Sequence, residues 1–171
     1  MAVRPLVQAN DPVLRKRAQR VTSFGPALRS LVTDMIDTMH AHNAVGLAAP
    51  QIGISQQILV IQLPEDKEEN DKLHVMCNPK IARQRGREEG VEACLSLPGF
   101  AGEVPRATMV TVKGQDLEGE PLRVKAQGFL ARVFQHEIDH LYGKLYIDRV
   151  EDAEKIWRVQ PSEEGEQSRS A

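Results

Sequence analysis

Residues 129–142, which read Phe-Leu-Ala-Arg-Val-Phe-Gln-His-Glu-Ile-Asp-His-Leu-Tyr, decide the fold. Apolar side chains recur in this segment at the three- and four-residue spacing of a helix; they are Phe129, Leu130, Val133, Phe134, Ile138 and Leu141. Gly143 follows directly and is a typical end for a helix. We therefore predict an apolar helix over residues 129–142.

The polar side chains of the same segment indicate a metal site. His136 and His140 are four residues apart, so on a helix both imidazoles lie on one face, one turn apart, and reach a single ion. Glu137 lies beside them, where a carboxylate takes a proton from water during hydrolysis. The alternative is an ordinary pair of helix histidines beside a solvated glutamate, and we consider it the weaker reading.

A hydrolytic metal needs about three protein ligands and one open position. No His or Cys follows His140, and the downstream candidates are carboxylates that lie beyond Gly143, namely Asp148, Glu151, Asp152 and Glu154. Upstream, Cys94 stands in a short apolar segment that ends at Pro98 and offers a thiolate. A free cysteine is usually a small buried residue, but the helix motif favours Cys94 as the third ligand. Cys77 has no such support and is interpreted as strand core.

The rest of the chain surrounds this helix with strands. We expect an earlier helix over residues 26–42, a charged loop over 63–72, a terminal helix over 151–159, and strands over 58–61, 74–77, 107–112 and 122–124. Segments rich in Gly, Pro, Asn and Asp separate the strands, at 63–71, 84–90 and 114–121. This order does not alternate strand with helix, so it predicts an α+β fold in which antiparallel β-sheets wrap around the helix that carries His136 and His140.

Length and composition predict one domain over residues 1–160 and a disordered polar tail over 161–171. The net charge is −2, and the tail alone carries three glutamates and one arginine, −3 + 1 = −2. The near-neutral body argues against binding of nucleic acid or of an anionic membrane. No apolar run approaches a membrane helix, and residues 1–10 lack a signal core. We expect a cytoplasmic protein, with an organellar origin and a removed leader as the alternative.

Three motifs, in order, are similar to those of the peptide deformylase family. They are residues 44–51 (Ala-Val-Gly-Leu-Ala-Ala-Pro-Gln), 92–96 (Glu-Ala-Cys-Leu-Ser) and 135–141 (Gln-His-Glu-Ile-Asp-His-Leu). The resemblance extends over about residues 3–155. It implies removal of the N-formyl group from the formylmethionine of newly made polypeptides, with release of formate. Two positions depart from the family pattern: Ala44 and Ala93 replace glycines, which would cost free energy if either position required positive φ.

The resemblance also implies roles for individual residues. It assigns the metal to Cys94, His136 and His140, and the stabilisation of the oxyanion to the side chain of Gln51 and the backbone N–H of Leu95. We expect the peptide substrate to pair with the backbone near Val45, Gly46 and Ala93, and its methionine side chain to lie against Val45, Phe129 and Val133. Arg106 either pairs with Glu92 behind the metal site or is an ordinary surface arginine.

The expected cofactor is one divalent metal, Fe²⁺ in the cell, with Zn²⁺, Ni²⁺ or Co²⁺ in preparations. The expected partners are N-formylmethionyl peptides and nascent chains, with a transient contact to the ribosome and no nucleic acid binding by the protein itself. Two other functions stay open at this point. One is a general His-Glu-x-x-His metallopeptidase, which would take a third ligand downstream of His140. The other is a metal-stabilised module that binds nascent chains without turnover.

Overall fold

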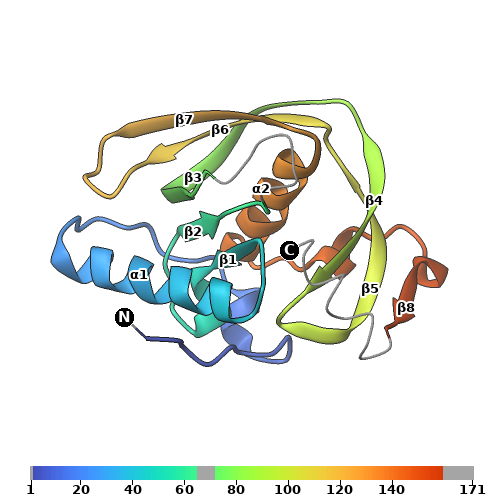
Figure 1. Ribbon diagram of the computed structural model, residues 1–171. Coiled ribbons are helices and arrows are strands. Elements are labelled where there is room, and N and C mark those ends of the chain that lie inside the picture. Colours follow the sequence, from blue (N-terminus) through green and yellow to red (C-terminus); the bar gives the residue numbers. More distant parts are fainter. Residues whose placement is uncertain (1, 65–71, 160–171) are drawn as a thin grey trace.

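The computed structural model describes residues 2–64 and 72–159, which form two α-helices, eight strands and short 3₁₀ turns (Figure 1). The helices are α1 (Pro26–Ala41) and α2 (Gly128–Leu141). The strands are β1 (Gly46–Ala48), β2 (Ile58–Ile61), β3 (His74–Arg85), β4 (Glu88–Cys94), β5 (Leu97–Arg106), β6 (Met109–Gln115), β7 (Pro121–Gln127) and β8 (Ile156–Arg158). The 3₁₀ turns are η1 (Pro12–Arg15), η2 (Ala49–Ile52), η3 (Tyr146–Arg149) and η4 (Ala153–Lys155).

The strands form two antiparallel sheets, with α2 lying between them (Figure 1). The larger sheet has the order β1-β2-β3-β6-β7 and the smaller has the order β4-β5-β8. The chain passes from the larger to the smaller sheet between β3 and β4, and returns between β5 and β6. This architecture confirms the predicted α+β class and the predicted central position of the helix.

Strand β2 shows how the core is divided, because all four of its residues are buried. Leu59 and Ile61 belong to the apolar cluster formed with α2, whereas Ile58 and Val60 belong to the cluster formed with α1. Successive side chains of a strand point to opposite faces of the sheet. The sheet is therefore covered by α1 on one face and by α2 on the other, which explains the uninterrupted apolar sequence of β2.

The helices predicted over 26–42 and 129–142 and the strand over 58–61 are confirmed, with these helix ends within one residue of the expected positions. The other predicted strands exist but are longer. The loop predicted over 84–90 is wrong, because β3 continues to Arg85 and β4 begins at Glu88. Strands β1, β4 and β5 were not predicted.

The predicted terminal helix over 151–159 is also wrong. This segment contains the short turn η4 and then β8, which pairs with β5 through Phe100↔Arg158 and Gly102↔Ile156. A helix of about nine residues is only marginally stable on its own, whereas pairing with the edge of β5 adds this segment to a sheet. The disordered tail over 161–171 and most of the charged loop over 63–72 were predicted for residues outside the described ranges. Within residues 2–64 and 72–159, no helix is long and apolar enough to cross a lipid bilayer.

Candidate metal centre

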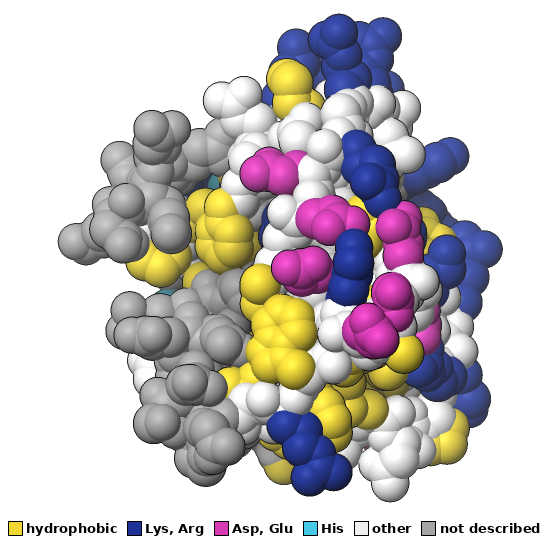
Figure 2. Space-filling view, turned by 90° about the vertical axis from the view of Figure 1, so that its right-hand side faces the viewer, with side chains coloured by type: hydrophobic (Ala, Val, Ile, Leu, Met, Phe, Trp, Pro, Cys, Tyr) yellow, Lys and Arg dark blue, Asp and Glu magenta, His cyan; other side chains and the backbone are white. Residues whose placement is uncertain are grey.

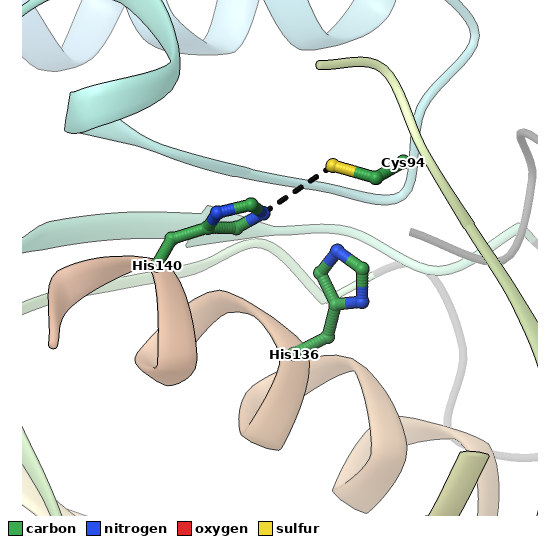
Figure 3. A group of neighbouring side chains, drawn as sticks. All are labelled: Cys94, His136 and His140. Atoms are coloured by element: carbon green, nitrogen blue, oxygen red, sulfur yellow. Dashed lines mark hydrogen bonds between the residues drawn. The ribbon is translucent and has the colours of Figure 1, made fainter. Parts of the chain in front are cut away.

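Cys94, His136 and His140 meet in the interior, between α2 and the end of β4 (Figure 3). One potential ligand atom from each of the three lies within 4.8 Å of the others, and all three residues are buried. Cys94 Sγ is 3.4 Å from His140 Nε2. The two histidines project from the same face of α2, as their spacing predicted (Figure 3).

A tight hairpin brings Cys94 to the helix. Cys94 pairs with Leu97, so β4 turns into β5 over Leu95 and Ser96. The ladder shifts register between Glu92 and Cys94, and such irregularities re-aim side chains at functional sites. The N-terminal segment holds the turn, because Ala9 donates its backbone N–H to the Ser96 carbonyl at 2.7 Å.

Glu92 orients the first histidine. His136 Nδ1 lies 2.8 Å from Glu92 Oε1, which leaves Nε2 facing the site. Arg106 donates two hydrogen bonds of 2.9 and 2.8 Å to the same carboxylate, and Arg132 donates a third at 2.7 Å. The predicted pairing of Arg106 with Glu92 is confirmed, and a surface position for Arg106 is excluded because its side chain is 3 % exposed.

This network continues to the end of α2. Arg106 Nη1 donates to Asp139 at 2.6 Å, and Arg149 donates to both Asp139 oxygens at 2.6 and 2.8 Å. Sequence reasoning gave no role to Asp139, Arg132 or Arg149. The signal available was a cluster of charges inside an otherwise apolar helix, since such charges are rarely buried without partners.

The charges around the site have matched partners. Burial would raise the pKa of Glu92, but hydrogen bonds from Arg106 and His136 outweigh burial and hold that pKa far below its usual range. Burial, together with the neighbouring His136, holds the pKa of His140 well below its usual value, so His140 is neutral, as a ligand must be.

Glu137 is the unusual member of the site. Both of its carboxylate oxygens are buried and have no hydrogen-bond partner among the described residues. Burial raises its pKa to about 7, against the opposing charge of His136. A Cβ atom on Gly46 would lie 2.7 Å from Glu137 Oε1. Glycine at position 46, which we expected to contact the substrate, therefore also allows the close approach of this carboxylate.

Gln51 lies next to the thiol, at the end of η2. Its Oε1 accepts the backbone N–H of Ala48 at 2.9 Å, which fixes the orientation of the amide. Its Nε2 therefore faces Cys94 Sγ at 3.6 Å and Ser96 Oγ at 3.4 Å. Leu95 follows Cys94 in the hairpin turn and packs against the α1 side of the core. The structure thus brings the thiol, Gln51 and Leu95 together.

The residues expected to contact substrate separate into two groups. Val45 and Val133 are buried in the cluster between α2 and the larger sheet, and Phe129 is half-buried against the same cluster. Ala93 lies in a different cluster, with Ala101 and Val159. Ala44 and Ala93 do not adopt positive φ, so the two alanines impose no backbone strain.

Within the described part of the chain, no carboxylate downstream of His140 belongs to a metal-ligating group. Asp148 binds Arg15 and caps the backbone at Leu145, Glu151 pairs with Arg87, and Asp152 caps η4. Among residues 2–64 and 72–159, the set Cys94, His136 and His140 is the metal-ligating cluster present. Two nitrogen donors and one sulfur donor suit a borderline divalent metal such as zinc or iron. The unpartnered buried atoms of His136 and Glu137 fit such an ion.

The buried ion pairs lead to a prediction for stability. Arg106→Met should lower the free energy of unfolding by about 3–5 kcal/mol, because it leaves Glu92 and Asp139 buried with fewer partners. Arg87→Met is the matched control: its pair with Glu151 is more than half exposed on both sides, so the change should stay within about 1 kcal/mol. Urea unfolding of both variants measures the difference, and equal losses would contradict the role given to the buried network.

Comparisons with known proteins agree with this geometry. The family model described as polypeptide deformylase matches residues 3–156. A peptide deformylase of Thermomicrobium roseum is 47% identical over 174 residues, covering 100% of this chain and 98% of the relative. One from Dehalococcoides mccartyi is 40% identical and covers 96% of each chain.

Solved structures give the same result. A peptide deformylase from Legionella pneumophila superimposes with a TM-score of 0.83 at 43% identity, covering 90% of this chain and 89% of that one. A peptide deformylase from Synechococcus elongatus in complex with actinonin gives 0.82 at 41% identity, covering 88% and 80%. The matching Cys-His-His site, sheets and sequence show that this chain belongs to the peptide deformylase family of metal-dependent hydrolases.

Proposed function

We propose that this deformylase acts on the N-terminal formylmethionine of newly made polypeptides, and that Glu137 moves the protons of the reaction. The observation that carries the proposal is the buried, unpartnered carboxylate of Glu137 beside Cys94, His136 and His140. A structural metal site has no need of such a group, whereas hydrolysis requires a base. This favours an enzyme over a non-catalytic binding module.

Glu137 acts first as base and then as acid. When bound, a divalent metal supplies Lewis acidity, which lowers the pKa of water and polarises a carbonyl. Glu137 accepts a proton from the water that attacks the formyl carbon. As the C–N bond breaks, Glu137 returns this proton to the leaving amine, so formate and a free N-terminus result. Burial, which raises the pKa of Glu137 to about 7, suits a group that must both take and give a proton.

Two hydrogen-bond donors, the side-chain amide of Gln51 and the backbone N–H of Leu95, are expected to bind the oxyanion of the tetrahedral intermediate. The bond from the Ala48 N–H to Gln51 Oε1 leaves Gln51 Nε2 directed at the site. The backbone N–H of Leu95 lies in the turn that follows the thiolate ligand. Fixed donors of this kind stabilise developing charge without reorganisation.

The substrate enters as an extended chain. In the described part of the protein, β1 and β4 are terminal strands of their sheets, so each has an edge without a strand partner. We expect the peptide backbone to pair near Val45, Gly46 and Ala93, as in other β-augmentation complexes. The methionine side chain would then lie against Val45, Phe129 and Val133.

We further propose Fe²⁺ as the metal in the cell, with Zn²⁺, Ni²⁺ or Co²⁺ as substitutes in preparations, because the two nitrogens and one sulfur of the site suit all four ions. Nascent chains are the proposed physiological substrates, met during a transient contact with the ribosome. Actinonin, which is bound in the Synechococcus elongatus relative, is expected to bind at the site formed by Cys94, His136 and His140.

The donor role of Gln51 is testable. Gln51→Leu keeps the size of the side chain and removes the donor, so we expect kcat to fall about 10²–10³-fold while KM and metal content change little. Gln127→Leu, on an exposed position of β7, serves as the control. Steady-state kinetics with metal analysis measure both, and an unchanged kcat in Gln51→Leu would remove Gln51 from the mechanism.

The proposed substrate is tested with matched peptides. Formyl-Met-Ala-Ser should release formate, whereas acetyl-Met-Ala-Ser, which differs by one methyl group, should react far more slowly. A general metallopeptidase would instead cleave internal bonds of both peptides. Cleavage inside the peptides, without formate release, would refute the proposed function.

A further inference from the structure

The outer face of the larger sheet is basic where α1 does not cover it. Three rows of paired residues run across β3, β6 and β7 there. The rows are Lys80–Lys113–Arg123, Arg83–Thr111–Lys125 and Arg85–Met109–Gln127. We call its six cations the basic face: Lys80, Arg83, Arg85, Lys113, Arg123 and Lys125, all of which are exposed.

Successive side chains of a strand point to opposite faces of the sheet, and this alternation places the six cations on the same face. Ile81, Val110 and Val112, their neighbours on β3 and β6, turn inward to the cluster around α2. Arg83, Arg85 and Lys125 line one open depression of about 370 Å³ on the outer side, together with Thr111 and Gln127. In Figure 2, Lys and Arg side chains gather at the top of the molecule, where β3, β6 and β7 lie in Figure 1, whereas Asp and Glu side chains occupy the middle of the view.

Among the described residues, these cations have no acidic partner. Within residues 2–64 and 72–159, none of the six forms an ion pair, although other surface arginines and lysines do so. The three rows contain no acidic residue. The nearest acids in sequence are Glu88 and Glu89 at the start of β4 and three acids of the β6–β7 turn, Asp116, Glu118 and Glu120. Asp116 accepts backbone N–H bonds, Glu118 pairs with Arg29, and Glu89 pairs with Lys155.

Protection of the sheet edges explains only part of this arrangement. Like charges directly opposite on neighbouring strands are destabilising, yet Lys113 faces Lys80 on one side and Arg123 on the other. Lysine and arginine protect the edges of sheets, which accounts for Arg123 and Lys125 on the edge strand β7. In the described part of the chain, residues 80–85 of β3 also lie along an open edge, because β2 pairs only with residues 74–77 of that strand. Edge protection does not account for Lys113, whose strand β6 is paired with β3 on one side and with β7 on the other.

We propose that the basic face binds the phosphate backbone of double-stranded RNA. Residues two apart on a strand are about 6.7 Å apart and neighbouring strands about 4.8 Å, so six cations occupy a small area. A nucleic-acid duplex is the ligand of matching charge density, with about one negative charge per 1.7 Å of axis in DNA and a comparable density in RNA.

The rows contain no aromatic side chain, and single-stranded binding relies on aromatic stacking, so a duplex fits better than a single strand. The choice of RNA over DNA rests on the proposed function, since nascent chains are presented by an RNA-rich particle. The proposal departs from our expectation of no nucleic acid binding, which considered the net charge and not its distribution.

The test measures binding of full-length, metal-loaded protein to a fluorescent 20-base-pair RNA duplex by anisotropy. We expect micromolar affinity at 50 mM salt and a plot of log K against log salt with a slope of about −4, as for four or five neutralised phosphates. Arg83→Glu/Lys113→Glu/Lys125→Glu should weaken binding more than about 10-fold. If that variant does not fold, the corresponding triple glutamine variant should also weaken binding, by less.

The matched control is Lys16→Glu/Arg20→Glu/Lys144→Glu, which changes net charge equally at exposed positions near the C-terminal end of α2. It should bind RNA within a few-fold of wild type. Both triple variants should retain turnover of formyl-Met-Ala-Ser, so binding and catalysis are scored separately. Equal losses in the two variants, no RNA binding by wild type, a preference for phosphatidylglycerol vesicles over RNA, or self-association through the basic face in place of RNA binding would each overturn the proposal.

Discussion

Replacement of Glu137 by glutamine is expected to lower kcat/KM for a formyl-Met peptide by about 10³–10⁴-fold while metal content stays at the wild-type level. Glutamine has nearly the same shape as glutamate, but its amide cannot accept a proton from water. The side chain is buried against Gly46, so a larger or shorter residue would confuse loss of the base with loss of packing. Glu137→Gln separates the two.

The control for this variant is Glu120→Gln, which removes an exposed carboxylate in the turn before β7. It should leave kinetics and metal content unchanged. Metal analysis of the same Glu137→Gln sample decides the interpretation, because a variant that has lost its metal says nothing about proton transfer. Wild-type turnover by metal-loaded Glu137→Gln would exclude the acid/base role.

Cys94→Ala is expected to have the second large effect. The variant keeps His136 and His140 but loses the sulfur ligand, so metal affinity should fall by at least about 100-fold, and turnover with it, since hydrolytic sites hold their metal with about three protein ligands. The chain contains a matched control in Cys77, which is also buried but lies in β3 against the α1 side of the core. Burial raises the pKa of Cys77 to about 11, so it is a neutral thiol and no competitor for the metal.

Cys77→Ala should retain metal and activity and lose only some packing in the core. Equilibrium dialysis followed by elemental analysis measures the metal affinity of both cysteine variants. Full metal retention and full activity in Cys94→Ala would contradict the assignment of the third ligand.

The central helix was predictable because its evidence is local. Its apolar spacing and the interval between His136 and His140 can be read within fourteen residues, and α2 forms where they indicate. Strand β2 was equally clear, because burial on both faces makes its sequence continuously apolar. A helix or strand whose apolar pattern depends only on its own residues can be predicted from the sequence.

Strands β4 and β5 were missed because they carry buried charge. Glu92 and Arg106 occupy interior positions that would be apolar in an ordinary strand, and each is stabilised by a partner that is distant in sequence. Their pattern therefore resembles a polar loop. Strand β8 forms by pairing with the edge of β5, and the sequence of residues 156–158 alone does not indicate this partner.

The residues of the metal site also differ in how far the local sequence could predict them. Spacing alone indicated His136, Glu137 and His140. Cys94 was favoured because no His or Cys follows His140, and the family motif then supported it, whereas Gln51 needed the family motif. A hairpin and a 3₁₀ turn bring Cys94 and Gln51 in from elsewhere in the chain. The supporting arginines became visible only in three dimensions. Physical reasoning from the sequence thus reached the residues that share one helix, and contacts between elements required the fold.

The most direct test of the central claim is formate release from formyl-Met-Ala-Ser by anaerobically prepared metal-free protein, before and after the addition of one equivalent of Fe²⁺, Ni²⁺, Co²⁺ or Zn²⁺. The site built from Cys94, His136 and His140 predicts no turnover without metal, and formate release that saturates at one metal ion per chain. Turnover that is independent of metal, or no formate with any of iron, nickel and cobalt, would contradict it.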